Sequence, residues 1–429
     1  MRLLIATYYY PPWSLPAANR WAAMTTHLRE LGHEVTIVTS AAPVRQRPGG
    51  EVSSGELGEV VRTADLNSNS ALRRLLRRPA ASGEPSALGV ADVASTSGLL
   101  TRVIVPDAYL VSWNPWARHA VTRLLEDQRI DCVITSGPPF STHLLGLGAR
   151  RRRARWIAEF RDGWLFERLT PPFPTAPQRG LERRLEQLTV SRADAVVGVT
   201  APIVDDFATR LGVAAHLIPN GWDPESSPSR SDGAGLLDPA KFSFVHTGTI
   251  SGPWGRDPGA LLEALKRLIT ANPALAHRIE VLFVGLATAT DLRRLGDPAL
   301  RGVVRHAGVV DRASSFALQR AADALLLITS PNVGEATGKL FEYLGSGRPI
   351  IALANGNEAA RIVRETGTGM AVAPDDVSGI AITLQRAIDG ELQTRYVPRG
   401  LDRYSYPGPA RLMAALAERV CQEDLRATA

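Results

Sequence analysis

Cysteine is nearly absent from this sequence: Cys132 and Cys421 are the only two among 429 residues. Two thiols cannot form a disulfide framework or a thiolate metal centre. Long apolar runs are also missing, since none approaches the roughly 18 residues that cross a bilayer. The first residues, MRLLIATYYYPP, contain one basic residue and a very short apolar stretch, which predicts a β-strand and not a signal peptide. We therefore expect a cytoplasmic protein.

Two common nucleotide-binding motifs are missing as well. No Gly-x-Gly-x-x-Gly follows the first expected strand, which disfavours a dehydrogenase, and no P-loop occurs. What is present is a globular composition, 45% hydrophobic and 21% charged, in a chain long enough for two α/β domains. The net charge of +6 comes mostly from arginine clusters such as 150–153. Such a charge suits phosphorylated small molecules, anionic lipid or nucleic acid, although most of these arginines fit an ordinary solvated surface.

Short apolar runs separated by helical segments recur along the chain. They cover 2–7, 34–40, 131–136, 155–160, 194–200 and 216–220 in the first half, and 242–249, 279–285, 303–308, 323–329, 349–353 and 369–373 in the second. Near-continuous apolar runs are typical of parallel strands that are covered on both faces. The pattern predicts an α/β fold with two doubly wound, Rossmann-like domains, 1–222 and 223–400, and an active site in the cleft between them.

Residues 41–100 interrupt this alternation. They are rich in Ser, Gly, Arg and Pro and have weak periodicity, so we expect a partly flexible insertion in the first domain. Within it, ALRRLLRRP at 71–79 has the spacing of an amphipathic helix, which either packs on the protein surface or faces a membrane.

The segment SPNVGEATGKLFEYLGSGRPIIAL, 330–353, predicts a strand end, a loop, a helix and a second strand. Thr337 is a suitable N-cap, so Gly338 and Lys339 begin the helix and Leu340 completes its first turn. The backbone N–H groups of this turn form an anion site. Lys339 adds a positive charge where the helix dipole disfavours one, a cost that a bound phosphate would reverse. Glu342 follows one turn later on the same face, within reach of ribose hydroxyls.

This segment resembles the donor-binding element of the GT-B fold glycosyltransferases, in particular the large retaining family 4. HEVTIVTS after the first helix and LIPNGWD at 217–223 resemble two further elements of that family, so the resemblance covers nearly the whole chain. It implies that Glu342 binds the donor ribose, that the first domain holds the acceptor and the second the donor. It also implies that a helix in 401–429 crosses back to the first domain.

The resemblance is imperfect at the first acidic position. The family carries two glutamates with seven residues between them, whereas Glu335 and Glu342 have six residues between them and Gly334 occupies the expected position. Either a reshaped loop lets Glu335 reach the sugar ring, or that role is lost and backbone groups hold the sugar.

HTGTISGPWGRDPGALLEAL, 246–265, resembles the loop with which the family grips the donor phosphates. The family has an Arg just after the first Gly, where Thr249 follows Gly248 here, and a Lys shortly before the helix, which Arg256 matches. A guanidinium binds a diphosphate bidentately, so we expect Arg256 and Lys339 to neutralise the phosphates. The alternative is that Arg256 pairs on the surface with Asp257 or Glu263.

EFRDGW, 159–164, resembles a Phe-Arg-Asp-x-Trp element of some family members. Asp162 is a candidate to orient the acceptor hydroxyl or to accept its proton, and Arg161 is a candidate to hold Asp162 or a phosphate. A purely structural ion pair is the alternative. In the aromatic loop YYYPPWSLPAANR, 8–20, Trp13 suits stacking on a sugar and Arg20 could reach the acceptor. His143, after a later strand, is a further acceptor candidate.

These features predict the transfer of a sugar from a nucleotide-diphosphate sugar to a hydroxyl of a glycan, a lipid-linked molecule or a small metabolite. Retention of anomeric configuration is implied by the resemblance. No Asp-x-Asp occurs, which weighs against the metal-dependent GT-A glycosyltransferases. We expect no metal and no cofactor, because arginine, lysine and a helix N-terminus would neutralise the leaving diphosphate.

Two other functions stay open. One is a nucleotide-sugar epimerase of the same fold, and the other is a non-catalytic basic protein that binds a polyanion or a membrane. A nucleic-acid partner is not expected, since the charges are scattered instead of forming one patch. A lipid-linked acceptor would bring the protein to the inner face of a membrane as a peripheral protein. The oligomeric state is left open.

Overall fold

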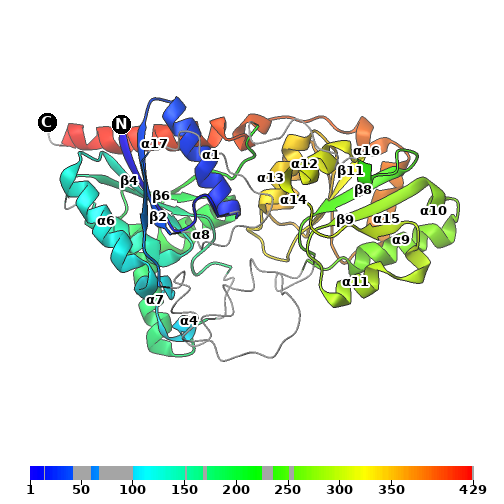
Figure 1. The fold of residues 1–429 in the computed structure, drawn as a ribbon, viewed down its shortest axis with the longest axis horizontal. Coiled ribbons are helices and arrows are strands. Elements are labelled where there is room, and N and C mark those ends of the chain that lie inside the picture. Colours follow the sequence, from blue (N-terminus) through cyan, green and yellow to red (C-terminus); the bar gives the residue numbers. More distant parts are fainter. Residues whose placement is uncertain are drawn as a thin grey trace. The chain divides into compact units, whose positions relative to one another are not determined.

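The computed structural model describes residues 1–13, 15–41, 59–66, 100–149, 152–167, 172–224, 235–250 and 256–427. The chain divides into two compact units (Figure 1). The first contains Met1–Pro219 together with Pro407–Ala429, and the second contains Asn220–Tyr406. The expected amphipathic helix at 71–79 lies outside the described residues.

The first unit is built on a seven-stranded sheet with the order β3-β2-β1-β4-β5-β6-β7 and parallel pairing throughout. Its strands follow the apolar runs of the sequence because their side chains are buried on both faces. The strands are β1 (Arg2–Thr7), β2 (Glu34–Ser40), β3 (Val60–Thr63), β4 (Cys132–Gly137), β5 (Arg155–Phe160), β6 (Ala195–Gly198) and β7 (Ala215–Leu217).

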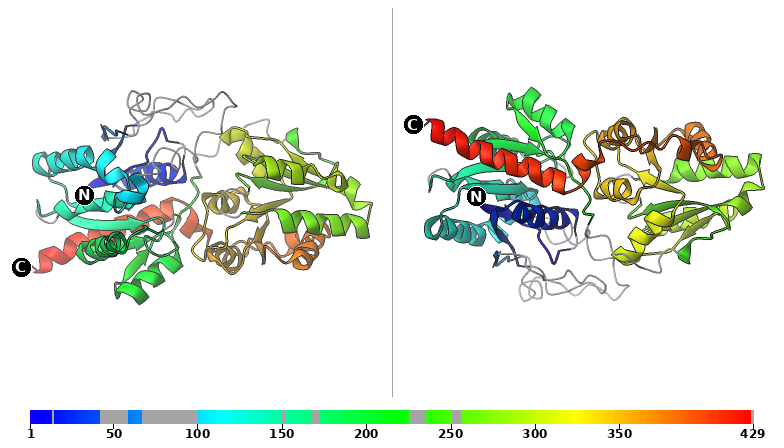
Figure 2. Two further views of the ribbon diagram at one scale, coloured as in Figure 1. Left: turned by 90° about the horizontal axis from the view of Figure 1, so that it is seen from below. Right: turned by 90° about the horizontal axis from the view of Figure 1, so that it is seen from above.

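Helices cover this sheet (Figure 2). The first helix begins with a proline at Pro16, which needs no N–H partner there, and is followed by Gly32 in the left-handed region at φ 86°. The last helix of the chain packs beside the first one within this unit. The helices are α1 (Pro16–Glu30), α4 (Leu100–Val103), α5 (Tyr109–Ser112), α6 (Asn114–Asp127), the 3₁₀ helix η1 (Phe140–Gly148), α7 (Ala176–Arg192), α8 (Ala201–Leu211) and α17 (Pro407–Ala427).

One part of the expected insertion belongs to the sheet. β3 pairs in parallel with β2, with Val61 opposite Val38, at the edge of the first sheet. The prediction of a partly flexible insertion at 41–100 included no strand, so β3 was missed. A strand of four residues is too short to give a clear alternation, and its neighbours in sequence mask it further.

The second unit has a six-stranded parallel sheet with the order β10-β9-β8-β11-β12-β13. Its strands are β8 (Phe242–Thr247), β9 (Ile279–Val284), β10 (Val304–His306), β11 (Ala324–Ile328), β12 (Ile350–Leu353) and β13 (Gly369–Val372). Its helices are α9 (Gly259–Ala271), α10 (Leu275–Arg278), α11 (Ala289–Leu295), η5 (Pro298–Leu300), α12 (Arg312–Ala321), α13 (Gly338–Ser346), α14 (Glu358–Thr366), α15 (Val377–Ile388), α16 (Glu391–Thr394) and η6 (Leu401–Tyr404).

A hydrophobic core lies on each face of the second sheet. Leu261 and Leu265 of α9 and Leu384 of α15 belong to one core. Leu340 and Phe341 of α13 belong to the other. Fully burying a leucine or phenylalanine side chain contributes about 1.5–3 kcal/mol, so these residues fix the position of α13 against the sheet.

Each sheet has one point at which the strand order reverses direction. In the first sheet β1 lies between β2 and β4, and in the second β8 lies between β9 and β11. In doubly wound sheets, ligands bind outside the carboxyl ends of the strands at such a point. Among the residues that the structure describes, no helix combines the length and the apolar character that a membrane crossing requires.

Candidate functional site

Three glycines follow the carboxyl ends of adjacent strands in the second sheet. Gly248, Gly285 and Gly308 follow β8, β9 and β10, with φ angles of 125°, 134° and 71°. A β-carbon on Gly285 would lie 2.4 Å from the carbonyl oxygen of Gly248, and one on Gly248 would lie 1.5 Å from Cε of Lys339. The missing side chain of Gly248 therefore makes room for the Lys339 side chain above the end of β8, and that of Gly285 lets the Gly248 backbone approach.

The amino end of α13 lies beside these strand ends. Thr337 is the N-cap residue, as the sequence indicates, but its side chain makes no capping hydrogen bond. Its hydroxyl oxygen is instead buried without a hydrogen-bond partner. The backbone N–H groups of Gly338 and Lys339 donate to no acceptor among the described residues. Polar hydrogens and a helix dipole thus converge at this end of α13.

Leu340 has a different environment from the one expected. Its side chain is fully buried in the core and its N–H donates to the carbonyl of Thr337 at 3.0 Å. The expectation that Leu340 offers a free N–H to a ligand is therefore not supported, because a tight first turn already uses this group.

The ammonium group of Lys339 has a lowered pKa. Burial, and then the nearby Arg256 cation, lower the pKa of its ammonium to about 8, while Glu342 and Glu335 act in the opposite direction. The Lys339 side chain is half-buried, and its Nζ donates no hydrogen bond within the described part of the chain. A partly desolvated cation without a hydrogen-bonding anion is costly, and an anionic ligand would reduce that cost.

Arg256 and Glu335 form an ion pair that brings the two loops of the site together. Nε and Nη2 of Arg256 donate to Oε1 of Glu335 at 3.0 and 2.7 Å. Oε2 of Glu335 accepts from the backbone N–H of Ser330 at 3.0 Å and from its hydroxyl. The two surface partners considered for Arg256 have other cations beside them: Asp257 accepts from Arg294 at 2.8 Å, and Glu263 lies 3.8 Å from Arg267.

Glu342 lies one helical turn beyond Lys339 and is held by a residue that sequence analysis missed. Nε2 of Gln319, on α12, donates to Oε2 of Glu342 at 3.4 Å and to the hydroxyl of Thr247 at 3.0 Å. Burial raises the pKa of Glu342, whereas Arg312, Gln319 and Lys339 act to lower it.

His246, on β8, was also missed. Its Nδ1 donates to the carbonyl of Leu326 at 2.9 Å, which leaves Nε2 as an acceptor, and that atom is buried without a donor. Burial, and then Lys339, lower the pKa of the imidazole to about 3, so the ring is neutral at physiological pH. Only the tertiary arrangement identifies such an atom, because a histidine in an apolar strand is usually a satisfied core residue.

Buried polar atoms without a partner gather around α13. Within the described residues of the second unit, the side-chain atoms of this kind are Nε2 of His246, Oε1 of Gln319 and Oγ1 of Thr337. Each lies near Lys339 or Glu342: His246 through its electrostatic interaction with Lys339, Gln319 through its contact with Glu342, and Thr337 as the N-cap. Buried polar groups in folded proteins are nearly always paired, so this clustering marks a site for a polar ligand. Thr249, next to Gly248, is partly exposed at its edge.

In the first unit, Arg161 and Asp162 follow β5 as expected. Arg161 donates to the hydroxyl of Ser136 at 2.7 Å and to the carbonyl of Pro138, so it fastens the end of β5 to the loop after β4. Its Coulombic interaction with Asp162 shows that the two charges are close. Arg161 thus has structural hydrogen bonds of its own, and Asp162 stays the candidate for the acceptor hydroxyl.

The three expected acceptor residues have different surroundings. Trp13 is partly exposed, packs against Tyr9 with ring centroids 5.6 Å apart, and has a buried indole N–H without a partner. His143 is fully buried, its Nδ1 lies 2.9 Å from the Thr135 hydroxyl, and burial lowers its pKa to about 3. Of the three, Trp13 therefore keeps the geometry of a stacking surface.

Arg20 departs from its expected role. Its side chain is 1% exposed and is paired with Glu159, which is fully buried, at 2.6 Å. It also donates to the carbonyls of Pro219 and Ile218 at 2.7 and 3.1 Å. A guanidinium enclosed in this way presents no surface to an acceptor, so the expected acceptor contact is replaced by a structural one: Arg20 ties α1 to β5 and to the end of the first unit.

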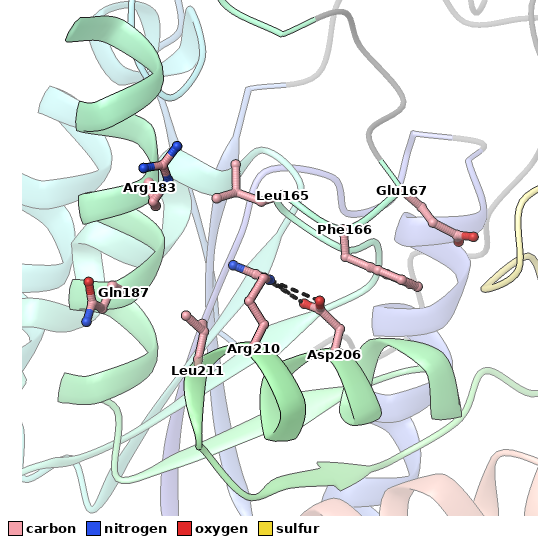
Figure 3. Close-up of a pocket in the computed structure, with 8 residues that line it drawn as sticks. All are labelled: Leu165, Phe166, Glu167, Arg183, Gln187, Asp206, Arg210 and Leu211. Atoms are coloured by element: carbon pink, nitrogen blue, oxygen red, sulfur yellow. Dashed lines mark hydrogen bonds and ion pairs between the residues drawn. The ribbon is translucent and has the colours of Figure 1, made fainter. Parts of the chain in front are cut away.

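A pocket of about 600 Å³ lies elsewhere in the first unit (Figure 3). Arg210 extends from α8 in this view and is hydrogen-bonded to Asp206, one turn before it. None of the residues expected in the functional site lines this pocket. The full lining is Leu165, Phe166, Glu167, Arg183, Gln187, Asp206, Arg210 and Leu211.

Comparison with known proteins agrees with this geometry. Residues 17–221 match a family described as glycosyl transferase 4-like domain, and residues 243–389 match glycosyl transferases group 1. The chain belongs to the GT-B fold glycosyltransferases of family 4. The expected class and the expected pair of parallel, Rossmann-like sheets are thereby confirmed.

A particular relative is the phosphatidyl-myo-inositol mannosyltransferase of Mycolicibacterium smegmatis, which is 32% identical over 212 residues. That alignment covers 47% of this chain and 51% of the relative, so the chain matches about half of its length. A sucrose-phosphate synthase from Thermosynechococcus elongatus has a similar fold, with a TM-score of 0.61, 17% identity and full coverage of both chains. Anabaena HepE, solved in complex with UDP, gives a TM-score of 0.56 at 15% identity, with 100% of this chain and 99% of HepE covered.

Proposed function

We propose that this protein transfers a sugar from a nucleotide-diphosphate sugar to an acceptor hydroxyl, and that the donor binds where β8 meets the amino end of α13. The observation that carries the proposal is the cluster of unpaired polar groups around Lys339. It combines a half-buried ammonium with a lowered pKa, two backbone N–H groups that have no acceptor among the described residues, and three buried side-chain atoms without partners. A diphosphate with a ribose attached would supply both the anion and the hydroxyls that these groups lack.

The leaving group is the diphosphate, and its charge grows as the glycosidic bond breaks. Lys339 and the N–H groups of Gly338 and Lys339 are already placed at the amino end of α13 before the reaction begins, so they need little reorganisation to stabilise that charge. Arg256 lies close enough to lower the pKa of Lys339 and adds a second cation. We therefore propose transfer without a metal ion, and activity in excess EDTA tests this point.

The acceptor side of the proposal is assigned to the first domain. Asp162 orients the acceptor hydroxyl or accepts its proton, and Trp13 stacks on an acceptor ring. Retention of configuration follows the family resemblance, and proton NMR of the product anomer tests it. A glycan, a lipid-linked molecule and a small metabolite are the acceptor classes to screen. The lipid-linked class would place a cytoplasmic protein peripherally on the inner face of a membrane.

The buried histidines His143 and His246 do not supply the acid–base groups of an epimerase. Its chemistry requires residues that gain and lose protons near neutral pH. His246, in the proposed donor site, and His143 both have a pKa of about 3, so neither imidazole can act as an acid at pH 7.

Purified protein should be screened with UDP-, GDP-, dTDP- and ADP-sugars by thermal shift, since a ligand that binds the folded state raises the melting temperature. The best donor is then incubated with acceptor, and release of nucleoside diphosphate and the glycosylated product are measured together. Transfer that depends on Lys339 supports the proposal. Conversion of the donor to its epimer without transfer, or no binding of any nucleotide sugar, contradicts it.

A further inference from the structure

Gln319 joins the three elements that surround the proposed ribose position. It lies on α12, is 1% exposed, and its carboxamide nitrogen donates to the hydroxyl of Thr247 on β8 and to the carboxylate of Glu342 on α13. The same nitrogen also lies 3.4 Å from the hydroxyl of Ser315. A buried amide with contacts on two neighbouring elements restricts the rotamers of the groups that it touches.

Glu342 depends on this contact because its other surroundings do not orient it. The hydrogen bond from Gln319 is its one side-chain hydrogen bond within the described residues, while Lys339 and Arg312 act on it through charge. Charge attracts a carboxylate without fixing its rotation, whereas a hydrogen bond has a preferred direction. Tyr343, the next residue, is separately anchored by the backbone N–H of Thr247 at 2.8 Å, so the helix itself is held in place.

We propose that Gln319 is a positioning residue for the donor: it turns the Glu342 carboxylate toward the ribose hydroxyls. This inference rests on the proposed function, in which Glu342 receives those hydroxyls. A carboxylate that already accepts a hydrogen bond in the correct rotamer loses less conformational entropy when the ligand arrives, so the ribose is bound more tightly. The carboxamide nitrogen of Gln319 acts on the ribose through the Glu342 carboxylate.

The test measures the ribose contribution by itself. Affinity is determined by calorimetry for UDP and for 2′,3′-dideoxy-UDP, or for the corresponding guanosine pair if the wild type prefers that base. The Kd of the dideoxy ligand divided by the Kd of UDP reports the contribution of the ribose hydroxyls, because base and diphosphate are common to both ligands. In Gln319→Met, which keeps the length of the side chain without its hydrogen bonds, we expect this ratio to fall roughly tenfold, as for loss of a hydrogen bond to a charged group. The Kd of the dideoxy ligand should change less than twofold.

Ser315→Ala is the matched control. It removes another neighbour of the same amide on the same helix and leaves Glu342 untouched, so the ratio should keep its wild-type value. In a Glu342→Gln background, Gln319→Met should have little further effect on the ratio, because the two residues act as one unit. If Gln319→Met does not fold, Gln319→Asn keeps a buried amide that is one methylene too short to span the same contacts, and the same fall is expected.

A wild-type ratio in the folded variant, or an equal loss of affinity for both ligands, overturns the role of Gln319. Failure of the wild type to bind either nucleotide is a different result, because it contradicts the proposed function itself.

Discussion

The side chain of Lys339 occupies the space that a side chain on Gly248 would need. A β-carbon on Gly248 would lie 1.5 Å from Cε and 2.1 Å from Nζ of Lys339. Gly248 and Lys339 therefore depend on each other: because Gly248 has no side chain, the Lys339 ammonium can lie at the end of the sheet.

Gly248→Ala tests this relationship. The new methyl group should displace the ammonium, and we expect kcat/KM for the donor to fall roughly 10²-fold, as for loss of one charge-stabilising group. Gly302→Ala is the matched control, since Gly302 also has a positive φ, at 80°, but has open space where the β-carbon would lie. Both variants carry backbone strain of about 1–3 kcal/mol, so both should melt earlier, but only Gly248→Ala should lose activity. Equal activity in the two variants would refute the steric argument.

The charge of Lys339 should appear in the pH dependence. Its pKa in the free protein is lowered to about 8, so the ammonium is present at pH 7 and is lost as the pH rises through 8. We expect kcat/KM for the donor to decline above pH 8, since this parameter reports the free enzyme. In Lys339→Arg the guanidinium stays charged, and the decline should move beyond pH 10 even though the maximum activity is lower. A decline that stays at the same pH in Lys339→Arg would assign it to another group.

Substitutions of Glu335 and of Arg256 should distinguish the roles of the two residues, because they affect phosphate binding and turnover differently. Arg256→Met should weaken pyrophosphate binding roughly tenfold, because a charge-assisted contact to phosphate is lost. Glu335→Gln removes the carboxylate that now holds Arg256, so pyrophosphate binding should be kept or strengthened, while kcat should fall roughly tenfold if Glu335 holds the sugar. Asp257→Asn is the control, because it alters an exposed pair with Arg294. Unchanged turnover in Glu335→Gln would mean that backbone groups hold the sugar.

Arg20 should matter for stability and not for the acceptor. Arg20→Met leaves the Glu159 carboxylate buried without its partner, and we expect a loss of about 3–5 kcal/mol in the free energy of unfolding. Urea denaturation measures this loss, and Arg20→Met combined with Glu159→Gln should recover part of it. A large increase in the acceptor KM of a stably folded Arg20→Met protein would restore the acceptor role.

The sequence predicted the fold well because both sheets are parallel and buried. Each such strand is an apolar run that can be recognised without knowing which strands lie beside it. The segment after β11 contains a threonine, a glycine and a lysine in the order that is typical of a helix start. β3 was not predicted because a strand of four residues is too short to show a clear hydrophobic pattern. The partly exposed edge position of that strand weakened the pattern further.

The site was harder to predict because its supporting contacts join distant residues. Arg20 and Glu159 are separated by 139 positions, and Gln319 meets Thr247 across 72. An arginine in a loop near a strand end looks the same in sequence whether it binds substrate or a buried carboxylate. His246 and Gln319 became visible only as buried atoms without partners, which is a property of packing and not of residue type.

The most direct measurement is a crystal structure with a nucleoside diphosphate. The account predicts phosphate oxygens within hydrogen-bonding distance of the N–H groups of Gly338 and Lys339 and of the Lys339 ammonium, with the ribose hydroxyls on Glu342. A nucleotide bound elsewhere, with the amino end of α13 left in contact with solvent alone, would contradict it.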